Sequence, residues 1–278
     1  MRIGTSDELV TCYEKHERYK KMKQFGFDYL DLDMSRVLDG KSEEEGLSWL
    51  KEEKARIEEA GLTVCQVHGP WRYPPHDETP EVRAERMDVM KRSIRYTAML
   101  GCTDWVIHPL MPFGSRDDSD KEAFYGINYD FFRALLPTAK ENGVVICFEN
   151  MPMSRLEISP PEQTLKFIRE INDENFKLCL DTGHSIVRGC SPADAVRMAG
   201  KDLRVLHVHD SDGAADRHWV PGTGVIDWKE FVKALRETGF DGVFSLECLV
   251  RDFVPQASYD LRIRMTRAIV EEMLAAEN

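Results

Sequence analysis

This 278-residue sequence lacks long hydrophobic runs, paired cysteines and an excess of basic residues. No stretch of about 18 consecutive apolar residues occurs, which excludes a typical transmembrane helix. The opening residues, MRIGTSDELV, have no apolar core of the kind found in signal peptides, so a cytoplasmic protein is expected. No low-complexity linker divides the chain, and a single domain over residues 1–278 is predicted.

Cysteine spacing and net charge narrow the class of protein further. The seven cysteines are scattered, without a C-x-x-C pair, and four of them lie inside apolar runs: Cys65, Cys147, Cys179 and Cys248. This usage favours a reducing compartment with buried, unreactive thiols. The net charge of −12, from 49 acidic and 37 basic residues, disfavours attraction to nucleic acid or anionic lipid.

Eight short apolar runs alternate with longer segments of helical pattern. The runs predict β-strands at residues 2–6, 27–33, 63–68, 104–109, 144–150, 177–182, 205–210 and 243–248. Helix starts are indicated by Ser42 with Glu45, by Asp227 with Glu230, and by Thr79-Pro80, Ser159-Pro160 and Ser191-Pro192. Eight such units predict an α/β fold, a single (β/α)8 TIM barrel. A doubly wound open sheet is the alternative, but no glycine-rich phosphate loop follows the first strand.

Alternation along these strands separates two faces. The face expected to pack on the helices carries Val67, Ile107, Phe148, Leu180, Val208 and Leu246. The opposite face carries His68, His108, Glu149, Asp181, His209 and Glu247, each near the C-terminal end of its strand. Active sites of TIM barrels lie at those ends, so six strands in succession are predicted to bring metal-ligand side chains to one rim.

This set of side chains predicts a divalent-metal site. Three converging carboxylates repel one another unless a cation or shared protons compensate, and imidazole with carboxylate suits manganese, zinc, cobalt or iron. In HVHDSDGAADRH (207–218), His207 is expected one layer lower as a buried support, and Asp210 in a structural role. Asp212 is expected to orient a ligand histidine. Three roles are left open for Asp216 and His218: binding a second metal, contacting the substrate, or forming a solvated pair in the loop.

Several motifs resemble those of the xylose isomerase-like barrel superfamily. They are FEN (148–150), LDTGH (180–184), HVHDSDG (207–213), PGTGVIDW (221–228) and SLE (245–247). The superfamily includes sugar isomerases, ketose 3-epimerases, inosose-processing enzymes and endonuclease IV. The resemblance implies a metal held by Glu149, Asp181, His209 and Glu247, and a substrate contact by His184.

The resemblance also extends to the three-metal cluster of endonuclease IV. His68, His108, His184, Asp216 and His218 occupy places similar to its additional ligands, so the ligands alone do not separate an isomerase from a phosphoesterase. Three loops depart from the nuclease pattern: HGPWRYPPH, NMPMSR and DSDGAA. These departures and the acidic net charge favour sugar chemistry, and nucleic acid is not the expected partner.

The resemblance therefore implies a divalent-metal-dependent isomerase or epimerase of a sugar, sugar phosphate or cyclitol. Glu149 and Glu247 are the expected catalytic residues, exchanging a proton through a metal-bound enediolate. Manganese or zinc is expected, with magnesium, cobalt and iron left open. The alternative is an endonuclease IV-like multinuclear zinc phosphoesterase. A barrel that only binds sugar would not require two glutamates at the metal.

Loop residues at the same rim are the candidates for substrate contacts. His184, Trp71, Arg155, Arg217 and Trp219 are expected to bind a small carbohydrate substrate, and Phe113 could exclude water. Five rim arginines could hold a phosphate or carboxylate: Arg72, Arg155, Arg188, Arg217 and Arg251. Relatives are often dimers or tetramers, so a homo-oligomer is left open.

Overall fold

The structure is a computed structural model that describes residues 1–71, 79–110, 120–249 and 256–276. Eight parallel strands form one sheet in the order β7-β6-β5-β4-β3-β2-β1-β8. Their bounds are β1 Arg2–Ser6, β2 Tyr29–Asp33, β3 Thr63–His68, β4 Asp104–Ile107, β5 Val145–Glu149, β6 Phe176–Asp181, β7 Leu203–His207 and β8 Val243–Leu246. A parallel bridge between Val208 and Leu246 joins the two outer strands, which gives a nearly closed barrel. The predicted TIM barrel is thereby confirmed.

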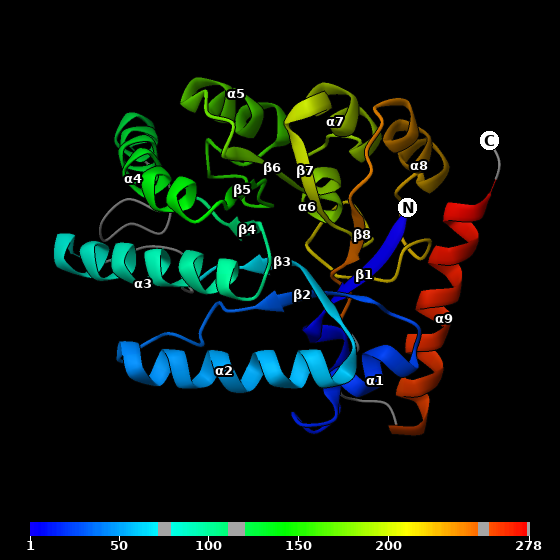
Figure 1. Ribbon diagram of the computed structural model, residues 1–278. Coiled ribbons are helices and arrows are strands. Elements are labelled where there is room, and N and C mark those ends of the chain that lie inside the picture. The colour runs from blue at the N-terminus through cyan, green and yellow to red at the C-terminus, as the bar shows by residue number, and fades with distance from the viewer. Residues whose placement is uncertain (72–78, 111–119, 250–255, 277–278) are drawn as a thin grey trace.

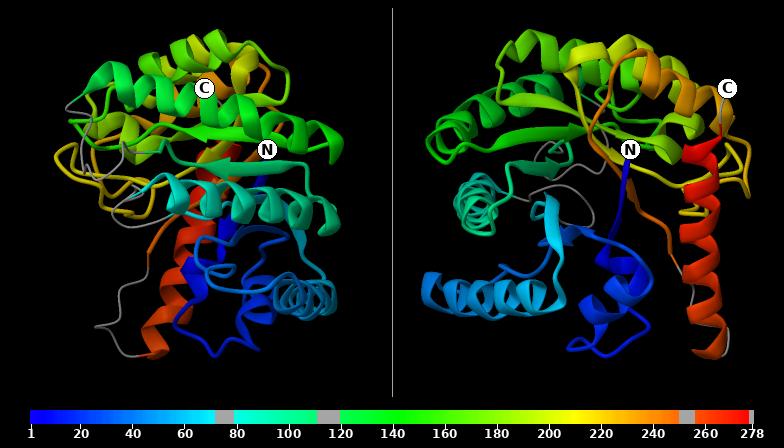
Figure 2. Two further views of the ribbon diagram at one scale, coloured as in Figure 1. Left: turned by 90° about the vertical axis from the view of Figure 1, so that its left-hand side faces the viewer. Right: turned by 45° about the vertical axis from the view of Figure 1, so that its right-hand side comes forward.

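Helices surround the strands, as the views in Figures 1 and 2 show. They are α1 Arg18–Gln24, α2 Glu43–Ala60, α3 Pro80–Met99, α4 Lys121–Glu141, α5 Pro161–Ile171, α6 Thr182–Val187, α7 Pro192–Ala199, α8 Trp228–Glu237 and α9 Gln256–Ala275. Two short 3-10 helices, η1 (Asp7–Val10) and η2 (Gly200–Asp202), complete the connections. None of these described helices has the length and apolarity needed to cross a membrane.

The predicted helix starts mostly coincide with the observed ones. At α2, Ser42 Oγ accepts from the Glu45 amide and the Glu45 carboxylate accepts from the Ser42 amide, so the capping box is confirmed. At α3, Thr79 Oγ1 accepts from the Val82 amide, and Pro80 occupies the first turn. The start of α5 lies one residue later than predicted, because Pro161 rather than Pro160 occupies its first turn.

The two strand faces differ as expected. On the outer face, Phe148 packs against Phe132 and Phe167 with ring centroids 5.0 and 5.1 Å apart, in the core between barrel and helices. Inside the barrel, a lower layer of buried side chains consists of Val106, Cys147, Cys179 and Val205. All seven cysteines are free thiols, and of the four expected to be buried only Cys65 is half-buried. This apolar layer closes the barrel beneath the residues at the strand ends.

Candidate metal centre

A cavity of about 310 Å³ opens where the strands end, above the lower layer. Its described lining includes seven of the side chains predicted as metal ligands: His68, His108, Glu149, His184, Asp216, His218 and Glu247. Because the strands are parallel, their C-terminal ends bring residues far apart in sequence to one rim. These side chains form three groups, each with donor atoms within 4.8 Å of one another. Cys179 of the lower layer completes a fourth such set with Glu149 and His207, which are both members of the first group.

The first group consists of Glu149, Asp181, His207 and Glu247. Nδ1 of His207 lies 3.2 Å from Glu149 Oε1 and 3.3 Å from Glu247 Oε2. Glu149, Asp181 and His207 are the last residues of β5, β6 and β7, and Glu247 follows β8 directly. Four donors from four adjacent strands therefore converge on one point.

The sequence placed His209 in this group, whereas the structure places His207 there. The predicted strand 205–210 is observed at Leu203–His207, and its register against β6 is irregular between Leu178 and Cys179. As a result His207 pairs with Asp181 and lies level with it. His207 is buried, as expected, but it lies level with Asp181 rather than one layer lower. Counting residues from predicted strand ends cannot detect such an irregularity.

Asp31, at the inner face of β2, fixes the orientation of His207. Its Oδ2 lies 3.0 Å from His207 Nε2 and accepts a hydrogen bond of 2.8 Å from Gln66. With Nε2 facing Asp31, Nδ1 is directed to the carboxylates of the first group. Asp31 was not among the predicted site residues. The alternation of YLDLD, which places Asp31 and Asp33 on one face, was the available signal.

The second group joins His68 and His108 to Glu149. The two Nε2 atoms lie 3.1 Å apart, and Nε2 of His108 is also 3.1 Å from Glu149 Oε2. Nδ1 of His68 donates to the carbonyl of Gly69, which leaves Nε2 facing the cavity. Glu149 is thus shared between the first and second groups.

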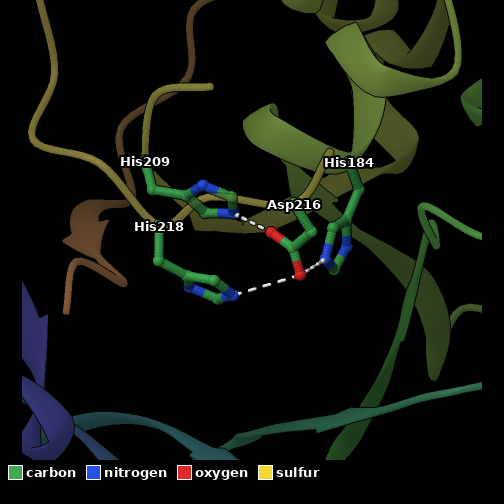
Figure 3. A group of neighbouring side chains, drawn as sticks. All are labelled: His184, His209, Asp216 and His218. Carbon is green, nitrogen blue, oxygen red and sulfur yellow. Dashed lines mark hydrogen bonds and ion pairs between the residues drawn. The ribbon is translucent and has the colours of Figure 1, made fainter. Parts of the chain in front are cut away.

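The third group contains His184, His209, Asp216 and His218, shown in Figure 3. Asp216 lies between the imidazoles: its Oδ2 is 3.2 Å from Nε2 of both His184 and His218. Nε2 of His209 lies 3.7 Å from Asp216 Oδ1 and 3.0 Å from Asp181 Oδ2. The rings of His209 and His218 stack with centroids 4.2 Å apart. His209 therefore connects the third group to the first.

The motif LDTGH builds this connection. Asp181 Oδ1 caps α6 by accepting from the His184 amide, while Oδ2 faces His209. Thr182 Oγ1 donates to the carbonyl of His209 and accepts from its amide. A Cβ atom at Gly183 would overlap the His209 ring, so this close approach requires glycine. The sequence of the motif is thus explained by contact with His209, in the segment that follows β7.

The outer nitrogens of His184 and His218 are held by backbone carbonyls. Nδ1 of His184 donates to Asn150 at 2.9 Å, and Nδ1 of His218 donates to Glu247 at 2.8 Å. Asn150 is itself fixed, because its amide group bonds the backbone of Asp181 in both directions. Each histidine therefore presents Nε2 to the centre, which is the arrangement that metal-binding histidines adopt.

Burial and mutual contacts shift the ionisation of these groups. Although burial opposes it, His207 and His108 hold the pKa of Glu149 well below its usual range. Burial, with Glu149 and Asp181 nearby, raises the pKa of Glu247 to about 7. Despite burial, Glu149 raises the pKa of His68 to about 9. The carboxylates and imidazoles therefore stabilise one another as ion pairs in a site with little solvent.

Residues 19–269 match the model of the family described as xylose isomerase-like TIM barrel. The chain belongs to this family.

Three relatives illustrate where this xylose isomerase-like chain lies within the family. It is 26% identical to a D-psicose 3-epimerase of Enterocloster bolteae over 95% of this chain and 90% of that protein. A 32% identical match to the uncharacterized protein MJ1311 of Methanocaldococcus jannaschii covers 43% of this chain and 42% of that protein. The crystal structure of the IOLI protein with a bound zinc atom superposes with a TM-score of 0.79 at 19% identity, covering 99% of this chain and 98% of that one. At this identity the superposition establishes the fold alone.

In this xylose isomerase-like barrel, Asp210 anchors the loop that carries Asp216 and His218. Its carboxylate accepts from the amides of Gly222 and Gly224, both at 2.9 Å, and from Trp228 Nε1 at 2.8 Å. The structural role expected for Asp210 is confirmed. Asp212, expected to orient a histidine, instead pairs with Arg217 at 2.8 Å and accepts from loop amides. Its partner could not be inferred from spacing alone.

The predicted substrate contacts lie at different distances from the centre. Trp71 lines the cavity, with its ring centroid 5.4 Å from that of His108. Arg217 and Trp219 line a neighbouring cavity of about 490 Å³, which shares Leu249 with the first. Arg155 is exposed in the loop after β5, outside the described lining of either cavity. Arg72, Phe113 and Arg251 lie outside the described residues.

Proposed function

We propose that the protein is a divalent-metal-dependent isomerase or epimerase acting on a sugar or cyclitol. The observation that carries this proposal is the convergence of Glu149 and Glu247 with Asp181 and His207 at the barrel rim. The name of the Enterocloster bolteae relative, a D-psicose 3-epimerase, supports sugar as the substrate class.

The donor set fits a divalent cation. The first group offers one imidazole nitrogen and three carboxylates, which suits manganese or zinc. Oε2 of Glu247 is buried without a hydrogen-bond partner among the described residues, so it has a free acceptor facing the group. Such a buried acceptor is costly unless a proton or cation satisfies it. When bound, a divalent cation polarises the substrate carbonyl and so acidifies the neighbouring C–H group.

Glu149 and Glu247 would perform the proton transfers. They approach His207 from β5 and β8, so a substrate carbon between them has a carboxylate on either side. One glutamate would remove the proton next to the carbonyl, which gives an enediolate. The other would return a proton to the same or the adjacent carbon. Such acid–base assistance typically contributes about 10²–10⁴-fold to the rate.

Exchange of substrate C–H protons with deuterium oxide tests this proposal. We expect wild-type protein loaded with manganese to exchange a proton next to the carbonyl in at least one member of a ketose and inosose panel. Glu149→Gln and Glu247→Gln should each lower exchange by about 10²-fold or more, and metal content is measured in parallel because each substitution also removes a charged ligand. Glu272→Gln, on the exposed surface of α9, is the matched control. Unchanged exchange in both active-site variants with normal metal content would contradict the assignment.

A multinuclear phosphoesterase is the second candidate. It is favoured by the presence of all three ligand groups in one cavity, with Glu149 shared and His209 connecting two groups. Two or three cations could then position and activate a water for attack on a phosphate ester. Elemental analysis separates the candidates: about one metal per chain favours the isomerase, whereas two or three zinc ions with cleavage of an abasic-site duplex favour the phosphoesterase.

A further inference from the structure

One side of the cavity consists of groups that belong to none of the three ligand groups. Ser6 ends β1, Glu8 follows it in η1, and Asp31 and Asp33 lie on the inner face of β2. All four line the cavity that holds the candidate metal ligands. We call these four residues the β1–β2 wall. Because it adjoins the metal centre, any substrate larger than the reacting carbons must contact it or lie close to it.

Two buried atoms of the wall have no partner in the described structure. Ser6 is 6% exposed and Asp31 is 2% exposed, yet Ser6 Oγ and Asp31 Oδ1 make no hydrogen bond. The second oxygen of Asp31 accepts from Gln66 and lies 3.0 Å from His207 Nε2. Leaving a buried polar atom unsatisfied destabilises the folded state, so these atoms indicate a polar ligand that completes them.

The wall contains acceptors but, among its described residues, no lysine or arginine. Among the described residues that line the cavity there is no lysine or arginine. Nearby guanidinium groups are placed elsewhere: Arg36 lies over the Trp71 ring at 5.8 Å, and Arg217 pairs with Asp212. A phosphate at the wall would therefore meet the carboxyl groups of Glu8, Asp31 and Asp33 with no lysine or arginine among the described lining residues to pair with it, and like charges at short range are unfavourable.

The pKa values of two carboxyl groups, Glu8 in the wall and Asp7 behind it, are raised. Burial and the neighbouring Asp33 raise the pKa of Asp7, which lies behind the wall, to about 8. The same two causes raise the pKa of Glu8. The Ser6 hydroxyl both donates and accepts hydrogen bonds, and Asp31 Oδ1 accepts them. Hydroxyl groups match such a surface, whereas an ammonium group would require acceptors alone.

We propose that the β1–β2 wall binds an uncharged, hydroxyl-bearing end of the substrate and rejects a phosphate at that end. This inference rests on the proposed function, because it assumes that the reacting carbons of the same molecule lie at Glu149 and Glu247. It narrows the substrate class to unphosphorylated polyhydroxy compounds, with the hydroxyls of the wall-facing end completing Ser6 Oγ and Asp31 Oδ1.

Binding of matched pairs to the manganese-loaded protein tests the wall. The pairs are D-fructose with D-fructose 6-phosphate and myo-inositol with its monophosphate, and 6-amino-6-deoxy-D-fructose is the cationic probe. We expect a neutral member to bind at least about tenfold more tightly than its phosphate. Glu8→Lys should reverse or abolish this preference, whereas Glu58→Lys, exposed on α2, should leave it unchanged. Glu8→Gln, which introduces no positive charge, should reduce the preference less than Glu8→Lys does. It replaces the lysine variant in the test if that variant unfolds.

Four results would overturn the inference. They are equal or tighter binding of the phosphates by wild type, an unchanged preference in both Glu8 variants, tighter binding of the amino sugar by more than about tenfold, and no binding of any neutral member. The assay measures binding without turnover. Binding of neutral sugars without exchange of a C–H proton would support the inference about the wall and contradict the proposed function. Exchange confined to phosphorylated sugars would support the proposed function and contradict the inference about the wall.

Discussion

Two layers of the barrel interior come from the same strands but have opposite chemistry. On β5 and β6, the lower layer carries Cys147 and Cys179, and the upper layer two residues later carries Glu149 and Asp181. The lower layer stabilises the fold through apolar burial. The upper layer buries charges, which is unfavourable unless they are paired or bind a cation. A single step of strand alternation thus separates a structural layer from a functional one.

Substitutions on β7 are expected to give the largest difference between the two layers in metal content and activity. We expect His207→Ala to lower metal content and kcat/KM by at least about 100-fold, because a donor of the first group is lost. Val205→Ala, two residues lower on the same strand, should retain metal and activity. His209→Ala distinguishes the two histidines, since it leaves the first group intact. Metal analysis and kinetics of the three variants check the assignment, and a greater loss of the first metal in His209→Ala would contradict it.

The upper layer alone should make metal affinity depend on pH. Histidine must be neutral to bind a metal, and the pKa values of His68 and His218 are raised to about 9 and about 10. Burial opposes both shifts, but Glu149 raises the first, and Asp216 and Glu247 raise the second. Below these values binding must displace protons, so affinity should rise with pH by about tenfold per unit for each proton displaced. Competition titrations against a chelator from pH 6 to 8 measure the slope, and a flat profile would exclude this linkage.

A smaller effect is expected at a glycine of the upper layer. Gly183→Ala places a methyl group against the His209 ring, and such overpacking typically costs about 1–3 kcal/mol. Gly126→Ala is the matched control in α4, where an added Cβ meets no atom within 4 Å. That control should stabilise the protein by about 0.5–1 kcal/mol through helix propensity. Thermal unfolding of both variants measures the contrast, and equal melting temperatures would contradict the packing argument.

The smallest functional effect is expected in the lower layer. Val106→Ala removes two methyl groups from a fully buried position and should destabilise by about 1–3 kcal/mol. Metal content and activity should remain within about twofold of wild type, because Val106 lies outside all three ligand groups. Denaturant unfolding and elemental analysis test both parts. A large loss of metal here would show that the layers are coupled.

The fold and the rim residues were largely predictable from the sequence. Alternation and cap signals identified all eight strands, and the outer face with Phe148 packs as expected. The assignment of individual side chains to the ligand groups was harder to predict, because it depends on strand register and on tertiary contacts. The irregular pairing beside Cys179 places His207 rather than His209 level with Asp181, and the Asp212–Arg217 pair forms within a loop. Asp31 and Ser6 were missed because single polar residues on early strands carry no motif.

The anchor at Asp210 bears on how this protein could have changed during evolution. Asp210 and Trp219 exchange backbone hydrogen bonds, and the Asp210 side chain holds the segment that follows, up to Trp228. Residues 211–218 therefore form a loop whose two ends are fixed independently of its tip. Insertions or exchanges at the tip add little chain-closure entropy and leave the barrel strands undisturbed. Asp216 and His218 could thus be gained or lost by loop replacement, while the donors on the strands are inherited with the fold.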